Sequence, residues 1–132
     1  MATGEEDGRD IALVGVCGAG KSTVVRLLRE RGYHIREIHQ EHSYVPRMWR
    51  TIHRPEVLVY LDASWDEVHR RRPHSLYTET YYHELVGRLR DARAHTDVYV
   101  LTDGRTPEAV ADLVAAQLVC PPGSAPVSPP TI

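Results

Sequence analysis

The stretch that decides the fold is Gly15-Val16-Cys17-Gly18-Ala19-Gly20-Lys21-Ser22. It follows the apolar run Ile11 to Val14, which predicts a buried strand, and it opens a helix predicted over Lys21 to Arg31. The whole stretch matches the pattern Gly-x-x-x-x-Gly-Lys-Ser/Thr in the strand-to-helix context that the pattern requires. With glycine at about 7% of residues, a chance match occurs on the order of once in a few hundred chains of this length. An ordinary glycine-rich turn is therefore the weaker interpretation.

These residue types suit the phosphates of a nucleoside triphosphate. Glycines let successive backbone N–H groups face inward, where they act on the β-phosphate together with the positive end of the following helix. We expect Lys21 to face solvent and to span the β- and γ-phosphates, Ser22 to coordinate Mg²⁺, and Thr23 to donate towards the α-phosphate. Lys21 is the one lysine beside fifteen arginines, and a compact ammonium fits this position better than a guanidinium. The residues predicted to bind the nucleotide here are Gly15, Val16, Cys17, Gly18, Ala19, Gly20, Lys21, Ser22 and Thr23.

The rest of the chain alternates predicted strands with predicted helices. Further strands are predicted at Tyr33 to His39, Val57 to Leu61 and Asp97 to Leu101. Ser64 is expected to cap a helix together with Glu67, which forms a capping box. A longer helix is predicted over Thr78 to Ala94, and a last one opens at Thr106-Pro107-Glu108. The alternation predicts an α/β class with a three-layer αβα fold around a small parallel sheet.

Composition limits the organisation and the partners of the protein. The 132 residues fit one domain, predicted at 11–119, with a polar disordered leader at 1–10 and a Pro/Ser-rich disordered tail at 120–132. The formal net charge is -2, which does not favour a nucleic-acid or membrane partner. Two distant cysteines and the lack of a signal pattern or an apolar run of about 18 residues predict a cytoplasmic location.

Two further segments resemble the P-loop kinases of small metabolites, the group of thymidylate, shikimate and adenylate kinases. One is Pro55 to Ser64 (PEVLVYLDAS), followed by Glu67 and three arginines, and the other is Val100 to Val110 (VLTDGRTPEAV). The resemblance implies that an arginine of the triplet reaches over the transferring phosphate and that a glycine and an arginine of the second segment flank the base. The residues concerned are Arg70, Arg71 and Arg72, and Gly104 and Arg105. The chain departs from these kinases in a shortened acceptor-binding region and in lacking an Asp-Arg-Tyr motif.

Two carboxylates follow predicted strands and are candidates for chemistry. Glu41 is a candidate general base for an acceptor hydroxyl, with a solvated loop acid as the alternative. Asp62 is a candidate Mg²⁺ ligand beside Ser22, or else it caps the following turn or orders the glycine loop. The arginine triplet is either catalytic or a solvated helix end. No Cys or His spacing is typical of a zinc site.

Three functions are compatible with these patterns. The first is a small kinase that transfers the γ-phosphoryl group of Mg-ATP to a small-molecule acceptor. The second is a nucleotide-dependent regulatory switch in which Gln40 to Arg54 senses the γ-phosphate. The third is a slow stand-alone NTPase in which water replaces the acceptor. ATP is favoured over GTP because the chain has no Asn-Lys-x-Asp segment. The sequence leaves the acceptor and the oligomeric state open.

Overall fold

The structure is a computed structural model, and it describes residues 8–51, 54–73 and 75–119. Within these residues, four strands form one sheet whose pairs are all parallel, in the order β2-β1-β3-β4. The strands are β1 (Ile11–Gly15), β2 (Ile35–Glu37), β3 (Val57–Asp62) and β4 (Val98–Leu101). The predicted parallel sheet is confirmed. The order places β1 between β2 and β3, so the end of β1 has a neighbouring strand end on either side.

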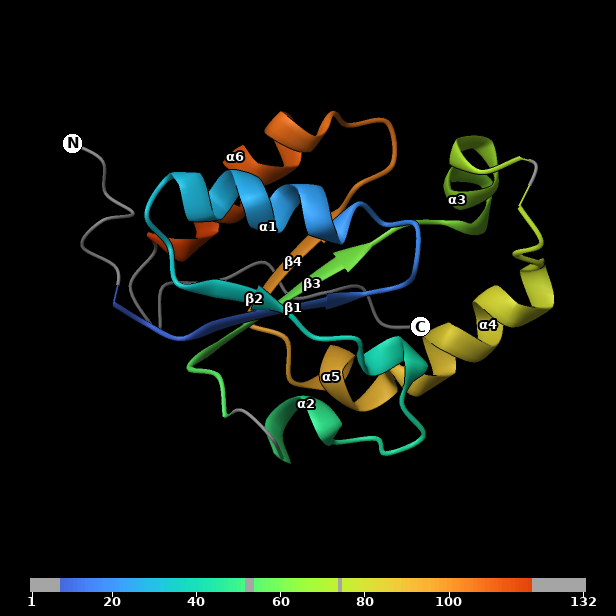
Figure 1. The fold of residues 1–132 in the computed structure, drawn as a ribbon, viewed down its shortest axis with the longest axis horizontal. Helices are drawn as coiled ribbons and strands as arrows, with labels where there is room; N and C mark the ends of the chain where they lie inside the picture. Colours follow the sequence, from blue (N-terminus) through green and yellow to red (C-terminus); the bar gives the residue numbers. More distant parts are fainter. Residues whose placement is uncertain (1–7, 52–53, 74, 120–132) are drawn as a thin grey trace.

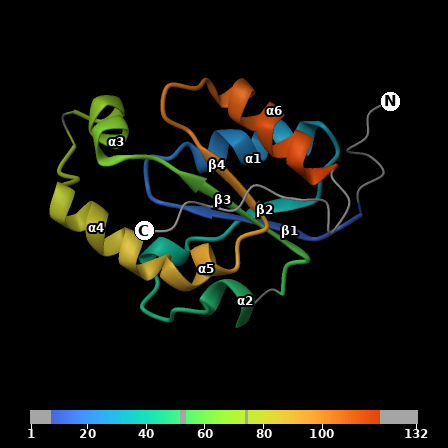
Figure 2. The same ribbon diagram turned by 180° about the vertical axis from the view of Figure 1, so that it is seen from behind.

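Helices cover both faces of this sheet (Figure 1). On one face lie α1 (Lys21–Glu30) and α6 (Pro107–Leu118), which pack side by side (Figure 2). On the other lie α2 (Met48–Thr51), α4 (Glu79–Arg88) and α5 (Arg90–Ala94). The short 3-10 helix η2 (Gln40–His42) and helix α3 (Trp65–Arg71) follow β2 and β3 at the carboxyl end of the sheet. A mixed α/β fold with helices on both faces of a parallel sheet is therefore established.

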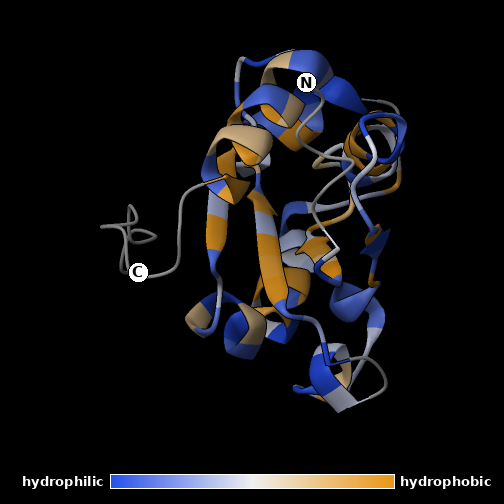
Figure 3. Cartoon of the chain, turned by 90° about the vertical axis from the view of Figure 1, so that its left-hand side faces the viewer, coloured by the Kyte–Doolittle hydropathy of each residue, from blue (hydrophilic) through white to orange (hydrophobic). Residues whose placement is uncertain are grey.

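The strands form the core because they are apolar on both sides. All five residues of β1 are buried, and so are the first five of β3. Figure 3 shows the hydrophobic strands between two helix layers whose outer surfaces are largely hydrophilic. A strand that is buried on both faces reads as a continuous apolar run, which is why β1 and β3 were recognisable from sequence. No helix in the described part of the chain is both long and apolar enough to cross a bilayer.

Two predicted elements differ from those observed. The helix predicted over Thr78 to Ala94 is interrupted at Leu89, which separates α4 from α5. The Leu89 N–H donates to the Val86 carbonyl, which tightens the chain into a three-residue turn just after Gly87, a poor helix former. Strand β2 is only three residues long, shorter than the predicted strand over Tyr33 to His39.

The predicted helix starts are largely confirmed. The Thr106 hydroxyl accepts from the Ala109 N–H ahead of Pro107, and the Ser64 hydroxyl accepts from the Glu67 N–H. The reciprocal half of the expected capping box is absent from the contacts described, because Glu67 bonds to arginines of its own helix instead.

The folded unit begins before Ile11. The Asp10 carboxylate pairs with the Arg36 guanidinium through two bonds of 2.8 Å, and Arg9 donates to the Leu118 carbonyl. The last residues of the predicted leader therefore belong to the domain. The predicted tail at 120–132 and positions 1–7 of the leader lie outside the described residues.

Candidate functional site

The loop from Gly15 to Ser22 joins β1 to α1 and depends on its glycines. A Cβ atom on Gly15 would collide with the Leu61 carbonyl oxygen of the adjacent strand. Gly18 and Gly20 have φ values of 96° and 88°, a region that other residues rarely adopt. The loop therefore turns sharply into the first turn of α1, and the N-terminal end of that helix faces the loop.

Lys21 occupies the inside of this loop. Its ammonium donates to the Gly15 carbonyl at 2.7 Å, to the Val16 carbonyl at 3.0 Å and to Glu41 Oε2 at 2.7 Å. These three acceptors match the three protons of an ammonium. The residue is only 5% exposed, so the expectation that Lys21 faces solvent is wrong. The ammonium is buried because two backbone carbonyls and a carboxylate face the inside of the loop and accept all three of its protons.

Glu41 comes from η2, directly after β2, and lies beside the loop. It is 1% exposed and forms a buried ion pair with Lys21, with His42 Nε2 3.6 Å from the same carboxylate oxygen. Its backbone carbonyl accepts from Arg88 of α4 at 3.2 Å. The structure thus joins the lysine predicted to bind phosphate to the candidate general base, which lies 20 positions away in the chain.

A second carboxylate, Glu37, contacts the residue predicted to bind metal. The Ser22 hydroxyl donates to Glu37 Oε1 at 3.0 Å. Glu37 is the last residue of β2, and it is partly buried. Sequence reasoning missed Glu37 because its contact with Ser22 depends on β2 lying next to β1, and the strand order cannot be read from the chain. The available signal was an acidic residue two positions before the end of the strand predicted over Tyr33 to His39.

Asp62, the other predicted metal ligand, is engaged elsewhere. Its carboxylate accepts from the Tyr99 hydroxyl at 2.5 Å and from Arg93 at 3.5 Å. Arg93 belongs to α5, on the sheet face opposite α1, which carries Ser22. The described contacts therefore do not bring Asp62 and Ser22 together. Among the described residues there is also no group of three or more His, Cys, Asp or Glu side chains arranged to hold a metal ion.

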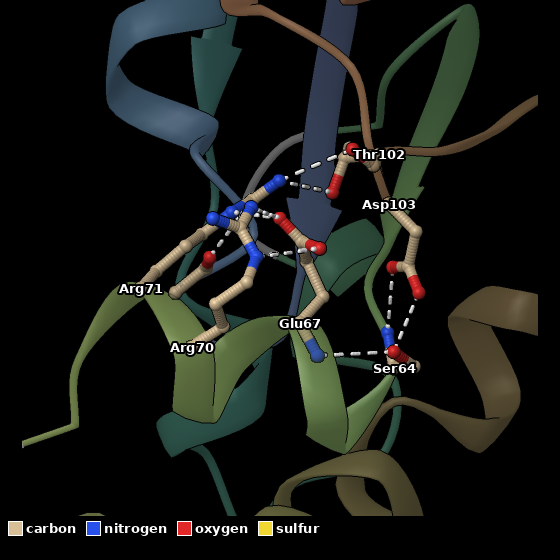
Figure 4. Close-up of polar contacts among 7 residues, drawn as sticks. Ser64, Glu67, Arg70, Arg71, Thr102 and Asp103 are labelled. Carbon is tan, nitrogen blue, oxygen red and sulfur yellow. Dashed lines mark hydrogen bonds and ion pairs between the residues drawn. The ribbon is translucent and has the colours of Figure 1, made fainter.

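The three consecutive arginines at the end of α3 have different roles, and Figure 4 shows Arg70 and Arg71 beside Glu67. Arg71 donates to the Gly18 carbonyl at 2.9 Å and to the Thr102 carbonyl at 3.1 Å, so it links the loop to the end of β4. Its Nε also donates to Glu67 at 2.8 Å. Arg70 is more exposed and pairs with the same Glu67 carboxylate. These contacts, with the hydrogen bond from Arg70 contributing most, hold the pKa of Glu67 below its usual value.

Arg72 contacts the loop at a different point. Its guanidinium lies 3.4 Å from the Cys17 sulfur. Both Arg71 and Arg72 therefore reach the loop, and Arg70 contacts only its own helix in the bonds described. Helix α3 lies over the loop closely enough that a Cβ atom on Gly18 would come within 3.1 Å of Val68.

A pocket of about 280 Å³ opens between the loop and the start of α6. Arg71, Arg72 and Arg105 bring positive charge to its wall, and Val24, Pro107 and Val110 bring apolar surface. Gly104, with φ 70°, turns the chain just before Arg105. Asp103 in this turn accepts from the Ser64 N–H and hydroxyl and fixes the turn against the end of β3 (Figure 4). The structure therefore brings Arg105 to the same pocket as the loop.

The remaining loop residues frame this arrangement. Val16 and Ala19 are buried, Cys17 and Gly18 are half-buried, and Thr23 lies half-buried on the first turn of α1. A second, more open groove of about 500 Å³ runs between α1 and β2 and includes Ser22 and Glu37. The loop therefore has open space on two sides, one beside Arg71 and one beside Glu37.

Comparison with known proteins does not assign this site. No protein-family model matches the chain, and no curated protein matches its sequence.

Proposed function

We propose that the chain binds Mg-ATP through a P-loop at Gly15 to Ser22, within a three-layer αβα P-loop fold, and acts as a small kinase on a small-molecule acceptor. The observation that carries the proposal is the buried ammonium of Lys21 inside a glycine loop at the start of a ten-residue helix. That ammonium and the helix N-terminus supply the positive charge that triphosphate binding needs.

The proposed Mg²⁺ ligands are the Ser22 hydroxyl and the Glu37 carboxylate. The two side chains already share a hydrogen bond of 3.0 Å, and oxygen donors of this type suit a hard cation. Mg²⁺ would neutralise phosphate charge there, with nucleotide oxygens completing its coordination. Asp62 fits this role less well because its carboxylate bonds to Tyr99 and Arg93.

The proposed base site is the 280 Å³ pocket that Arg71, Arg105 and Pro107 line. It adjoins Gly18, Ala19 and Gly20 of the loop, so a nucleotide could extend from the phosphates into it. Arg71 and Arg72 are the members of the triplet placed to reach bound phosphates, since both already contact the loop. Arg70 is given a supporting role, in which its ion pair with Glu67 orients that carboxylate.

Calorimetry with Mg-ATP tests the nucleotide proposal. Wild-type protein should bind, and Lys21→Met should not. Because Lys21→Met leaves Glu41 buried without its partner, the double variant Lys21→Met/Glu41→Gln serves as the folded control and should also fail to bind. Equal affinity in wild type and the double variant would rule out the P-loop assignment.

Glu41 is the proposed general base, and a rate measurement tests it. Once phosphates draw Lys21 away, the Glu41 carboxylate is left beside the γ-phosphate position. Glu41→Gln should lower turnover by about 10²–10⁴-fold while ATP affinity changes little. Near wild-type turnover in this variant would make Glu41 a structural partner of Lys21 only.

One observation favours a regulatory switch as the alternative. Glu41 adjoins Gln40, whose amide oxygen accepts from the Trp49 N–H and whose amide nitrogen donates to the Val45 carbonyl. A nucleotide that displaced Glu41 would therefore also move Gln40 and the exposed turn at Tyr44 and Val45. Absence of turnover with every acceptor, together with tight ATP binding, would favour this function.

A further inference from the structure

Two buried polar atoms beside the glycine loop have no hydrogen-bond partner in the part of the chain that the structure describes. They are Glu41 Oε1 and the Tyr77 hydroxyl oxygen. The third such atom, Arg36 Nε, lies on a side chain bound to Asp10 at the start of β1. Buried polar atoms are nearly always paired, so two unpaired ones on residues that adjoin the same loop require an explanation.

The two groups approach the loop from different elements. Glu41 lies in η2, and its other carboxylate oxygen holds Lys21. Tyr77 lies between α3 and α4, and its ring passes 3.8 Å from the Cβ position of Gly18. Trp65 and Tyr81 pack edge-on against this ring and fix it.

The electrostatic environment of Tyr77 supports this placement. Burial raises the pKa of the Tyr77 phenol above its usual value, and the acidic groups of Cys17, Tyr82 and Glu41 raise it further. The phenol is therefore protonated at neutral pH and is a hydrogen-bond donor. What places the two groups near each other is the loop itself, because Tyr77 lies against Gly18 and Glu41 binds Lys21.

We propose that Glu41 Oε1 and the Tyr77 hydroxyl together bind the hydroxyl group of an uncharged acceptor, and that this protein phosphorylates an alcohol rather than a phosphate or carboxylate. This inference rests on the proposed kinase function. A hydroxyl group satisfies both partners at once, because it donates to the carboxylate oxygen and accepts from the phenol. A phosphate acceptor is mostly a dianion at neutral pH, so it seldom has a proton to donate to Glu41 and would place further negative charge against that carboxylate.

The chemical step follows from this placement. The acceptor oxygen forms a bond to the γ-phosphorus of ATP, and the bond from that phosphorus to the β,γ-bridging oxygen breaks, so ADP leaves with the electron pair. The hydroxyl proton passes to Glu41 Oε1 and afterwards to solvent. The Tyr77 hydroxyl keeps its proton and orients the attacking oxygen.

Matched pairs of probes test the acceptor class. Adenosine, thymidine, glycerol and ribose are compared with AMP, TMP, glycerol 3-phosphate and ribose 5-phosphate, each added to wild-type protein. ADP release with Mg-ATP and the melting temperature with Mg-ADP are both measured. We expect stimulation of ADP release or thermal stabilisation from at least one uncharged member and not from its phosphorylated counterpart. A response to phosphorylated members alone, or to neither class, would overturn the inference.

A pair of tyrosine variants tests the assigned residue. Tyr77→Phe removes only the hydroxyl and should lower kcat/KM for the responding alcohol about 10-fold, which is the effect of one hydrogen bond, while the KM for ATP stays unchanged. Tyr81→Phe is the matched control, because Tyr81 is 38% exposed and packs on the same ring. Equal effects of the two variants would contradict the role of Tyr77.

The outcomes also separate the two proposals. Absence of Mg-ATP binding to wild type would remove the kinase function and the inference with it. Binding of Mg-ATP together with a response to phosphorylated probes only would leave the kinase function standing and overturn the alcohol acceptor.

Discussion

The Lys21 ammonium lies 2.7 Å from the Glu41 carboxylate, and the two side chains are 4% and 1% exposed. A buried ion pair of this kind stabilises a protein little relative to apolar residues, yet loss of one partner leaves an uncompensated charge. The pair also ties the glycine loop to the segment after β2. Any ligand that draws Lys21 towards phosphate therefore changes the environment of Glu41.

A double-mutant cycle should measure a favourable coupling free energy between Lys21 and Glu41. Lys21→Met and Glu41→Gln should each lower the free energy of unfolding, by up to about 3–5 kcal/mol for Lys21→Met, because it leaves a buried carboxylate unpaired. The double variant should lose less than the sum of the two. Urea denaturation measures the three variants. The exposed pair Arg26 and Glu30 is the control, and its cycle should give at most about 1 kcal/mol of coupling. Equal coupling in both cycles would mean that Lys21 and Glu41 are not buried together in solution.

Nucleotide binding should change the fluorescence of Trp49. This residue is buried, its backbone bonds to Gln40, and its indole N–H donates to Asp91 at 2.9 Å. The chain has two tryptophans, so the measurement uses a Trp65→Phe background. Mg-ATP should alter the emission more than Mg-ADP if the segment after Glu41 responds to the γ-phosphate. Identical spectra with and without bound ATP would show that the segment after Glu41 does not respond to the nucleotide.

The proposed nucleotide site should prefer ATP over GTP. The chain has no Asn-Lys-x-Asp segment to read guanine, and Arg105, which follows Gly104, lines the pocket proposed for the base. Competition against a fluorescent ATP analogue measures the preference. Arg105→Ala should weaken ATP binding about 10-fold through the loss of a charged contact, while Arg90→Ala, also exposed, should leave it unchanged. A clear preference for GTP would contradict the base site.

The contribution of Glu67 to stability should depend on pH. Its pKa is lowered in the folded protein, above all by the hydrogen bond from Arg70. The stabilisation is therefore fully present above the unfolded pKa of about 4.3 and is lost as pH falls through the lower folded value. Glu67→Gln should be less stable than wild type at pH 7 by about 1–2 kcal/mol, with the difference vanishing in acid. Melting curves across this range measure it. A difference that grows towards low pH would reverse the sign and contradict the assignment.

Local patterns in the sequence determined the two central strands, several helix starts and the glycine loop. The apolar runs of β1 and β3 identified buried strands, because a strand covered on both faces contains few polar residues. Ser64 and Thr106 marked helix starts because their hydroxyls accept the first free N–H groups. The glycine loop was recognisable because its backbone conformation restricts the residues that can form it.

Only the tertiary structure decided which distant residues meet. Glu37 reaches Ser22 because β2 lies next to β1, and Asp62 turns to Tyr99 and Arg93 because α5 covers its side of the sheet. Strand order and the packing of helices on each face are set by the summed burial of many side chains, and no local pattern encodes that sum. The burial of Lys21 against Glu41 is of the same kind, since each charge is tolerated inside only because the other is there.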